Sequence, residues 1–256
     1  MRKGKLVAFV LIVALIILVQ PNVYPTIKHI IYPKSFEEQI TTNNNVKSDK
    51  TLNKELVKEK YSGTQVIKVN NNVPTFTKDE LTLNGKDHWK KFSNLDILNR
   101  VGTAETLISV RSLPTESRGD ISNIKPTGFK QKKIIFNGKS DYLYNRCHLI
   151  AFELSGENDN PKNLFTGTRA LNANDGNRQQ SMVYYEDMIK NYVKQTNHHV
   201  LYQVTPIFSG MDLVAKGVRL QGRSIEDNQI SFNVYIFNVQ PGYQINYLTG
   251  NSMKEK

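Results

Sequence analysis

The chain is almost without cysteine, and this scarcity limits the kinds of protein it can be. Cys147 is the only cysteine among 256 residues, so no intrachain disulfide can form. Small secreted domains held together by several disulfides are therefore excluded, as are zinc sites built from several cysteines. The sequence also lacks a zinc-ligand spacing or a Cys/His peptidase pattern, which argues against a cell-wall hydrolase.

Acidic residues are few relative to basic ones. The chain has 34 Lys and Arg against 23 Asp and Glu, which gives a formal net charge of +11. Such a surplus suits a polyanionic partner, either nucleic acid or an anionic membrane surface. Hydrophobic residues make up 39% of the chain, enough for one sizeable core.

The N-terminus has the pattern of an export signal. Arg2, Lys3 and Lys5 precede an uninterrupted apolar run from Leu6 to Val19. The run is shorter than the roughly 20 residues that span a bilayer, yet no small-x-small cleavage site follows it. We therefore predict a signal anchor or a signal peptide over residues 1–20, with the anchor favoured. An anchor would leave a single-pass membrane protein with its domain outside the cell, whereas cleavage would give a secreted protein.

The segment after this run is polar and repetitive. From about residue 35 to residue 62 the chain is rich in Thr, Asn, Lys and Glu. This composition is typical of a solvated linker, which we predict over residues 21–64, with at most a frayed helix over residues 52–61. No internal repeat is visible. The remaining residues, 65–252, are predicted to form one folded domain.

Within this domain, alternating apolar residues predict strands and a helical spacing predicts helices. Strands followed by a helix and then by further antiparallel strands indicate an α+β fold. The predicted strands cover residues 65–69, 73–76, 141–152, 163–168, 199–206, 213–220, 230–239 and 243–247, and the predicted helices cover 87–98 and 181–195, with a loop-rich stretch over 100–136.

One short segment combines a base with a cation. His148 lies two residues after Arg146 on a predicted strand, so an imidazole could act as a base beside a phosphate-binding guanidinium. The alternative is a structural histidine, which is the commoner case. Cys147 and His148 cannot form a nucleophilic dyad, because consecutive residues of a strand point to opposite faces. Cys147 is therefore expected to be a small buried residue.

Three polar residues downstream could serve a metal ion or merely the fold. Asn163 and Asn172 flank a predicted strand, where an amide oxygen could bind Mg²⁺ or could cap a turn. Glu186 lies on the apolar face of the helix predicted over residues 181–195. A carboxylate facing inward is costly unless it has a partner, although an acid near a helix start also interacts favourably with the helix dipole.

Five short segments of the domain form a recognisable set. They are Tyr-Asn-Arg-Cys-His-Leu (144–149), Asn-Pro-Lys-Asn-Leu (160–164), Ala-Leu-Asn (170–172), Tyr-Tyr-Glu (184–186) and Tyr-Gln-Val-Thr-Pro (202–206). Nine residues separate Asn163 from Asn172, and fourteen separate Asn172 from Glu186. Together these segments and spacings resemble the DNA/RNA non-specific endonuclease family, and in particular its streptococcal DNA-entry nucleases. The resemblance covers about residues 65–250.

The resemblance implies a ββα-metal (His-Me finger) fold with a central antiparallel sheet and flanking helices. It also implies a sequence-non-specific endonuclease that cleaves DNA and RNA with one Mg²⁺, which Mn²⁺ can replace. His148 then corresponds to the general base, Asn172 to the direct metal ligand, and Glu186 to the residue that holds the metal's waters. Asn163 corresponds to a supporting residue.

Two arginines are weaker candidates. Arg146 is assigned to catalysis or phosphate contact, and Arg118 to substrate binding. The family's usual motif is Asp-Arg-Gly-His, so Asn145 and Cys147 depart from it, and the role of position 145 is open. The rival interpretation is an exported, basic nucleic-acid-binding or uptake protein without catalysis, which would need the charge but not His148, Asn172 and Glu186 together.

Overall fold

The computed structural model describes residues 47–174 and 176–255. The predicted signal segment and the predicted linker up to residue 46 lie outside these residues. Within them, no helix combines the length and the apolar character that a membrane span requires. From Lys47 onward the described chain forms one compact unit.

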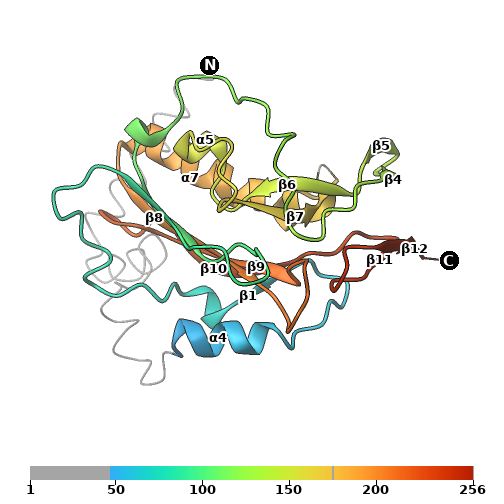
Figure 1. Ribbon diagram of the computed structural model, residues 1–256. Helices are drawn as coiled ribbons and strands as arrows, with labels where there is room; N and C mark the ends of the chain where they lie inside the picture. Colours follow the sequence, from blue (N-terminus) through green and yellow to red (C-terminus); the bar gives the residue numbers. More distant parts are fainter. Residues whose placement is uncertain (1–46, 175, 256) are drawn as a thin grey trace, which may run out of the picture. The chain divides into compact units, whose positions relative to one another are not determined.

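The centre of this unit is a six-stranded, fully antiparallel sheet (Figure 1). The strand order is β1-β10-β9-β8-β3-β2, so the three long strands lie in the middle. The bounds are β1 Val66–Lys68, β2 Trp89–Phe92, β3 Ala104–Ile108, β8 Val200–Ile207, β9 Gly217–Ser224 and β10 Ser231–Phe237. This sheet confirms the predicted α+β fold class.

Most of the candidate site residues lie on elements that cover one face of the sheet (Figure 1). The hairpin of β6 (Tyr144–His148) and β7 (Leu164–Thr168) continues into α6 (Arg169–Asn172), and α7 (Met182–Thr196) follows. The short helix α5 (Phe152–Ser155) packs against α7. Val218 and Leu220 of β9 belong to the same apolar core as Ile189 and Val193 of α7.

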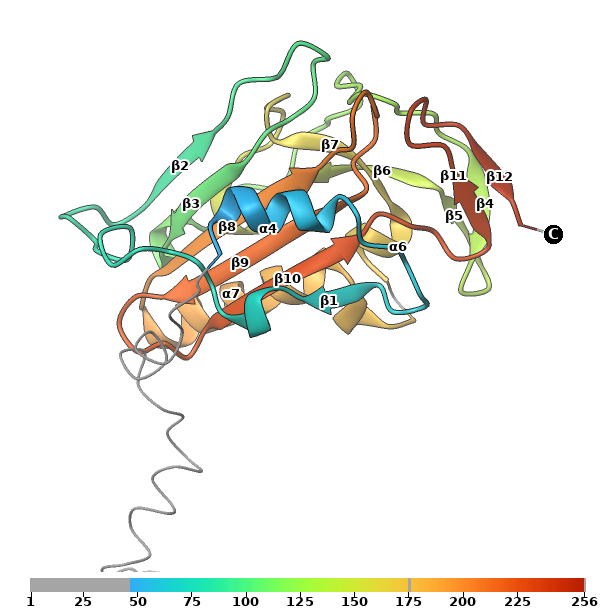
Figure 2. The same cartoon turned by 90° about the horizontal axis from the view of Figure 1, so that it is seen from below.

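The opposite face is covered by α4 (Asp49–Leu56), which crosses the sheet in Figure 2. Leu52 and Leu56 are buried in a second apolar cluster with Tyr235 and Phe237 of β10. Residues 58–64 are exposed, as expected for a linker, but the linker prediction is wrong for residues 49–56, which form this packed helix. The polar composition of this segment concealed a helix that buries only one narrow apolar stripe.

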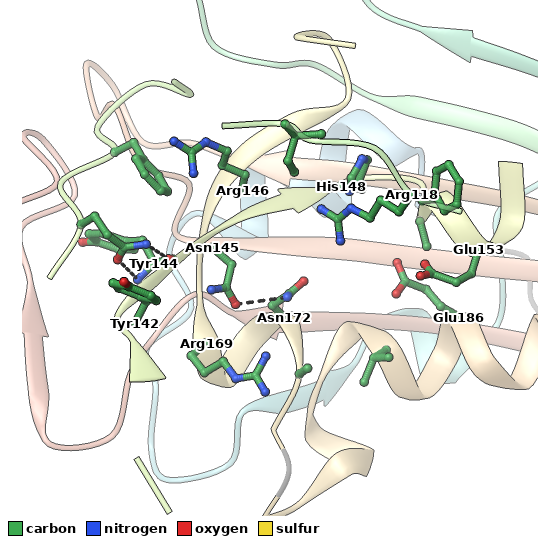
Figure 3. Close-up of a pocket in the computed structure, with 17 residues that line it drawn as sticks. Arg118, Tyr142, Tyr144, Asn145, Arg146, His148, Glu153, Arg169, Asn172 and Glu186 are labelled. Carbon is green, nitrogen blue, oxygen red and sulfur yellow. Dashed lines mark hydrogen bonds between the residues drawn. The ribbon is translucent and has the colours of Figure 1, made fainter. Parts of the chain in front are cut away.

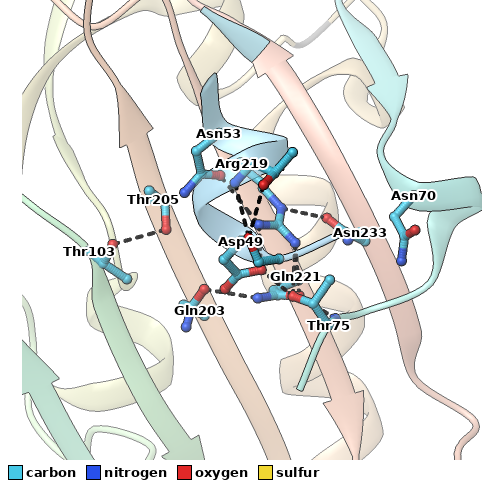
Figure 4. A network of polar contacts seen from close by, with 12 residues as sticks. Asp49, Asn53, Asn70, Thr75, Thr103, Gln203, Thr205, Arg219, Gln221 and Asn233 are labelled. Carbon is cyan, nitrogen blue, oxygen red and sulfur yellow. Dashed lines mark hydrogen bonds and ion pairs between the residues drawn. The ribbon is translucent and has the colours of Figure 1, made fainter. Parts of the chain in front are cut away.

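Beneath α4 the sheet carries a buried polar network (Figure 4). Arg219 is 1% exposed, and its guanidinium donates to Asp49 Oδ1 at 2.7 Å and to Asn233 Oδ1 at 2.9 Å. Thr75 Oγ1 accepts a third hydrogen bond at 3.0 Å, and Gln221 Oε1 a fourth at 3.3 Å. The buried charge is thus fully hydrogen-bonded, and the network ties α4 to the middle of the sheet.

Two further hairpins complete the fold. One pairs β4 (Lys133–Phe136) with β5 (Lys139–Tyr142), and the other pairs β11 (Tyr243–Ile245) with β12 (Ser252–Lys254). Ile134, Leu143 and Tyr144 form a small core, against which side chains of β11 pack. Single 3₁₀ turns lie at Asn70–Asn72, Val110–Ser112 and Arg178–Gln180.

Some predicted elements differ from the observed ones. The helix predicted over residues 87–98 is wrong, because Trp89–Phe92 is the edge strand β2, paired antiparallel with β3. No strand covers residues 73–76, where Thr75 is instead held by hydrogen bonds to Gln221. β9 begins and ends four residues later than predicted, because Arg219, Gln221 and Arg223 are buried strand residues whose polarity resembles that of a loop.

Candidate active site

All but one of the predicted site residues line one cavity of about 730 Å³ (Figure 3). His148 lies at the end of β6, Asn172 at the end of α6 and Glu186 in the second turn of α7. Arg118 and Arg146 also line the cavity. The ββα arrangement brings these side chains together because β7 and α6 carry the chain back past His148.

His148 is held as a neutral base. It is 7% exposed, and its Nε2–H donates to the carbonyl oxygen of Asn158 at 2.7 Å. Because a carbonyl can only accept, the hydrogen lies on Nε2 and the lone pair lies on Nδ1. Burial lowers the pKa of His148 below its ordinary value, and the hydrogen bond to Asn158 only partly offsets this. The imidazole can therefore accept a proton at neutral pH.

Asn158 also fixes the neighbouring loop. Its side-chain oxygen accepts a hydrogen bond from the backbone N–H of Gly119 at 3.2 Å. One residue thus sets the tautomer of His148 and holds the backbone next to Arg118. Arg118 is exposed, and among the described residues none forms a hydrogen bond or ion pair with its side chain. Its guanidinium is available to a phosphate in the cavity.

Asn172 is oriented by the residue that departs from the family motif. Its side-chain N–H donates to Asn145 Oδ1 at 3.2 Å, and Figure 3 shows its amide oxygen turned away from Asn145. Asn145 lines the same cavity and pairs with Gly167 in the β6–β7 register. An amide acceptor at position 145 can therefore perform this orienting contact without a negative charge.

Glu186 has no hydrogen-bond or ion-pair partner among the described residues. Burial raises the pKa of its carboxyl to about 8, and the negative charges of Glu153 and Asp187 add to this effect. A cation at this position would remove the cost of the ionised form. Amide and carboxylate oxygens are ligands suited to Mg²⁺, so Asn172 and Glu186 fit such an ion. Among the described residues, no group of three or more His, Cys, Asp or Glu is placed to hold a metal.

Asn163 lies outside the cavity lining and is 0% exposed. Its side chain accepts from the backbone N–H of Ile150 and donates to the carbonyl of Ile150, both at 2.9 Å. Its own carbonyl accepts from the N–H of Leu149 at 2.8 Å. Asn163 therefore clamps the backbone that follows His148 and does not itself reach the cavity.

Arg146 is also engaged with the protein. Its guanidinium donates to the carbonyl oxygens of Ile124 at 2.6 Å and Ser122 at 2.9 Å, and it lies over the ring of Phe129 at 4.6 Å. These contacts tether the loop that forms one wall of the cavity. Arg146 thus forms part of the cavity wall, and its catalytic role stays a prediction.

Cys147 points into the core, as expected, and is 1% exposed. A Cβ atom at Gly167 would lie 2.4 Å from Cys147 Sγ, so the thiol takes the space above a glycine on the neighbouring strand. Burial raises the pKa of this thiol, which keeps it protonated and unreactive.

Sequence reasoning missed two charged residues of the cavity. Arg169, the first residue of α6, lines the cavity and forms an ion pair with Asp141 at 2.8 Å. Glu153 lines the cavity beside Glu186. Its position five residues after His148 was visible in the sequence, but nothing there indicated that α5 would turn it toward α7.

Comparison with known proteins agrees with this geometry. The family model of the DNA/RNA non-specific endonucleases matches residues 80–226, more than half of the chain. The chain belongs to this family. The matched segment contains all of the candidate site residues, and the observed ββα arrangement confirms the predicted ββα-metal fold.

Several members with known structures or activities are similar to this chain. A deoxyribonuclease of Streptococcus dysgalactiae subsp. equisimilis is 32% identical over 117 residues, which are 45% of this chain and 35% of that protein. The chain thus matches only about a third of that relative's length. NucA of Streptococcus agalactiae with a bound magnesium ion is 29% identical with a TM-score of 0.64, over 75% of this chain and 88% of NucA. The nuclease Sda1 with a bound zinc ion shares the fold, with 24% identity and a TM-score of 0.59, over 65% of this chain and 82% of Sda1.

Proposed function

We propose that this chain is a sequence-non-specific endonuclease that hydrolyses phosphodiester bonds of DNA and RNA with His148 as general base and one Mg²⁺. The observation that carries the proposal is the convergence of a buried, neutral imidazole with the oxygen ligands of Asn172 and Glu186 in one cavity. A basic protein that only bound nucleic acid would not need these three side chains together.

Each residue has a defined task in this proposal. Nδ1 of His148 takes the proton of the attacking water, and Asn158 keeps that nitrogen unprotonated. Asn172 and Glu186 hold the Mg²⁺, and Asn145 orients Asn172. Bound there, the ion supplies positive charge that stabilises the phosphate during the reaction, and Mn²⁺ can replace it. Asn163 positions the backbone after His148.

Substrate binding is assigned to positive charge. Arg118 contacts a phosphate directly, and Arg146 supports the wall that faces it. Contacts to phosphate do not distinguish bases, so cleavage is expected to be independent of sequence and to weaken as salt rises.

The direct test is digestion of a plasmid and of a long RNA, with Mg²⁺ and with EDTA in place of Mg²⁺. We expect both substrates to be cut only with the metal. If a gel-shift assay shows that both nucleic acids bind, but neither is cleaved with or without the metal, the result would favour the alternative of a nucleic-acid-binding or uptake protein without catalysis.

We also propose that residues 1–20 direct the chain out of the cell's interior and that the nuclease domain acts there, either anchored or secreted. The support is the positively flanked apolar run and the basic charge. Fractionation of expressing cells tests this. Full-length protein in the membrane fraction indicates an anchor, a shorter form in the medium indicates a signal peptide, and full-length protein in the cytosol contradicts export.

A further inference from the structure

One carboxylate of the cavity has no task in the proposed reaction. Glu153 belongs to α5, a single helical turn that starts soon after His148. Its neighbours Phe152 and Leu154 are buried, whereas Glu153 itself is exposed. The turn therefore holds Glu153 on the side that lines the cavity.

The position of Glu153 relative to Glu186 is unusual for two acids. The two residues come from helices that pack against one another, and Figure 3 shows their carboxylates close together. Both residues line the same cavity as Asn172. Among the described residues, none forms a hydrogen bond or ion pair with either carboxylate.

Two facing carboxylates without a partner repel each other when both are ionised, so the metal-free pair is unfavourable unless one of them keeps its proton. A divalent cation between the two carboxylates attracts both of them, so the electrostatic energy of the site becomes favourable. The site also contains the amide oxygen of Asn172, which Asn145 turns away from itself. The three oxygen-bearing side chains together form a donor set of the kind that hard cations prefer.

Resting on the function proposed above, we propose that Glu153 is a second carboxylate for the divalent cation. The cation then meets two negative charges and one amide, where Glu186 and Asn172 alone would offer one charge. Affinity of oxygen sites for divalent ions rises with the number of charged ligands, so Glu153 sets how little metal this nuclease requires.

The test measures metal binding and not catalysis. Mn²⁺ is titrated calorimetrically into the metal-free full-length chain and into its Glu153→Gln variant. The matched control is Glu116→Gln, which removes an exposed carboxylate that lines a neighbouring cavity but not this one. We expect Glu153→Gln to raise the Kd for Mn²⁺ at least about tenfold, because one of two attracting charges is lost. Glu116→Gln should bind as the wild type does.

Melting temperatures give a second readout that a merely structural role would not reproduce. Without metal, Glu153→Gln should melt no lower than the wild type, because among the described residues no hydrogen bond or ion pair of Glu153 is lost. At one Mn²⁺ concentration above both Kd values, the gain in melting temperature should be smaller than in the wild type, since stabilisation by a ligand grows with the logarithm of its concentration divided by Kd. Glu153→Ala repeats both measurements without a polar side chain.

The outcomes separate this inference from the function on which it rests. Equal Kd values and equal metal-induced shifts for wild type and both Glu153 variants would overturn the role of Glu153 alone. A wild-type chain that binds no Mn²⁺ would overturn the proposed metal site as a whole. A loss of affinity as large in Glu116→Gln would assign the effect to overall charge.

Discussion

Replacement of His148 by alanine tests the central assignment, because the structure predicts separate effects on catalysis and on stability. Loss of a general base lowers turnover by about 10²- to 10⁴-fold, which corresponds to about 3–5 kcal/mol of transition-state stabilisation. Arg118 and the metal ligands stay in place, so binding of nucleic acid should persist.

The cost in stability follows from the surroundings of the ring. His148 is 7% exposed, and its removal leaves the Asn158 carbonyl without its 2.7 Å hydrogen bond. An unsatisfied acceptor costs about 1–3 kcal/mol when it is buried, and the Asn158 carbonyl is only partly buried, so the loss should not exceed this range. Each kcal/mol lowers the melting temperature of a domain of this size by about 2–4 °C. The variant should therefore remain folded at 25 °C.

The assay combines single-turnover cleavage of plasmid DNA, a filter-binding measurement and a thermal melt. The control is His199→Ala, which removes another mostly buried imidazole, one that is hydrogen-bonded to Glu226 and absent from the cavity lining. That variant should lose stability but keep turnover. Turnover of His148→Ala within tenfold of the wild type, with the fold intact, would refute the assignment of the base.

Further predictions concern pH, metal, the thiol and the sheet network. Because burial lowers the pKa of His148, kcat/KM at saturating Mg²⁺ should stay level as pH falls to 6.5 and decline only below it; a decline centred above pH 7 would contradict this. Asn172→Ala should lose most activity and Glu186→Ala a large part, each with a higher Mg²⁺ requirement and a near-normal melting temperature, as titration of Mg²⁺ in the cleavage assay will measure. Cys147→Gly should keep turnover within a few-fold of the wild type but unfold at a lower denaturant concentration, because removal of the buried side chain leaves a gap above Gly167. Loss of turnover in the folded variant would show that the thiol has a role in catalysis. Arg219→Ala should destabilise the domain by about 3–5 kcal/mol in a urea titration, because the buried polar groups around Arg219 lose their hydrogen-bond partner. An unchanged free energy of unfolding would show that this network does not hold α4 on the sheet.

Several parts of this protein follow from local patterns of residues. The helix over residues 182–196 and the strands at 164–168 and 200–207 follow from apolar residues at regular spacing, close to the predicted bounds. The segments that contain His148, Asn172 and Glu186, taken together with the others that carry the resemblance, were sufficient to indicate the family.

Other features were decided only by the tertiary structure, because they depend on partners far away in the chain. Trp89–Phe92 is a strand since β3 offers it an edge, although its local pattern suggested a helix. Leu52 and Leu56 are ordered because β10 supplies the apolar surface that they cover.

The same reason applies to the cavity. The tautomer of His148 is set by the carbonyl of Asn158, which no side-chain pattern encodes. Arg146 was a candidate for phosphate because of its charge, and the carbonyls of Ser122 and Ile124 direct it to the cavity wall. Glu153 and Glu186 meet only because α5 packs on α7. Residue type and spacing thus specify which chemistry is available, whereas long-range packing specifies which side chains can perform it.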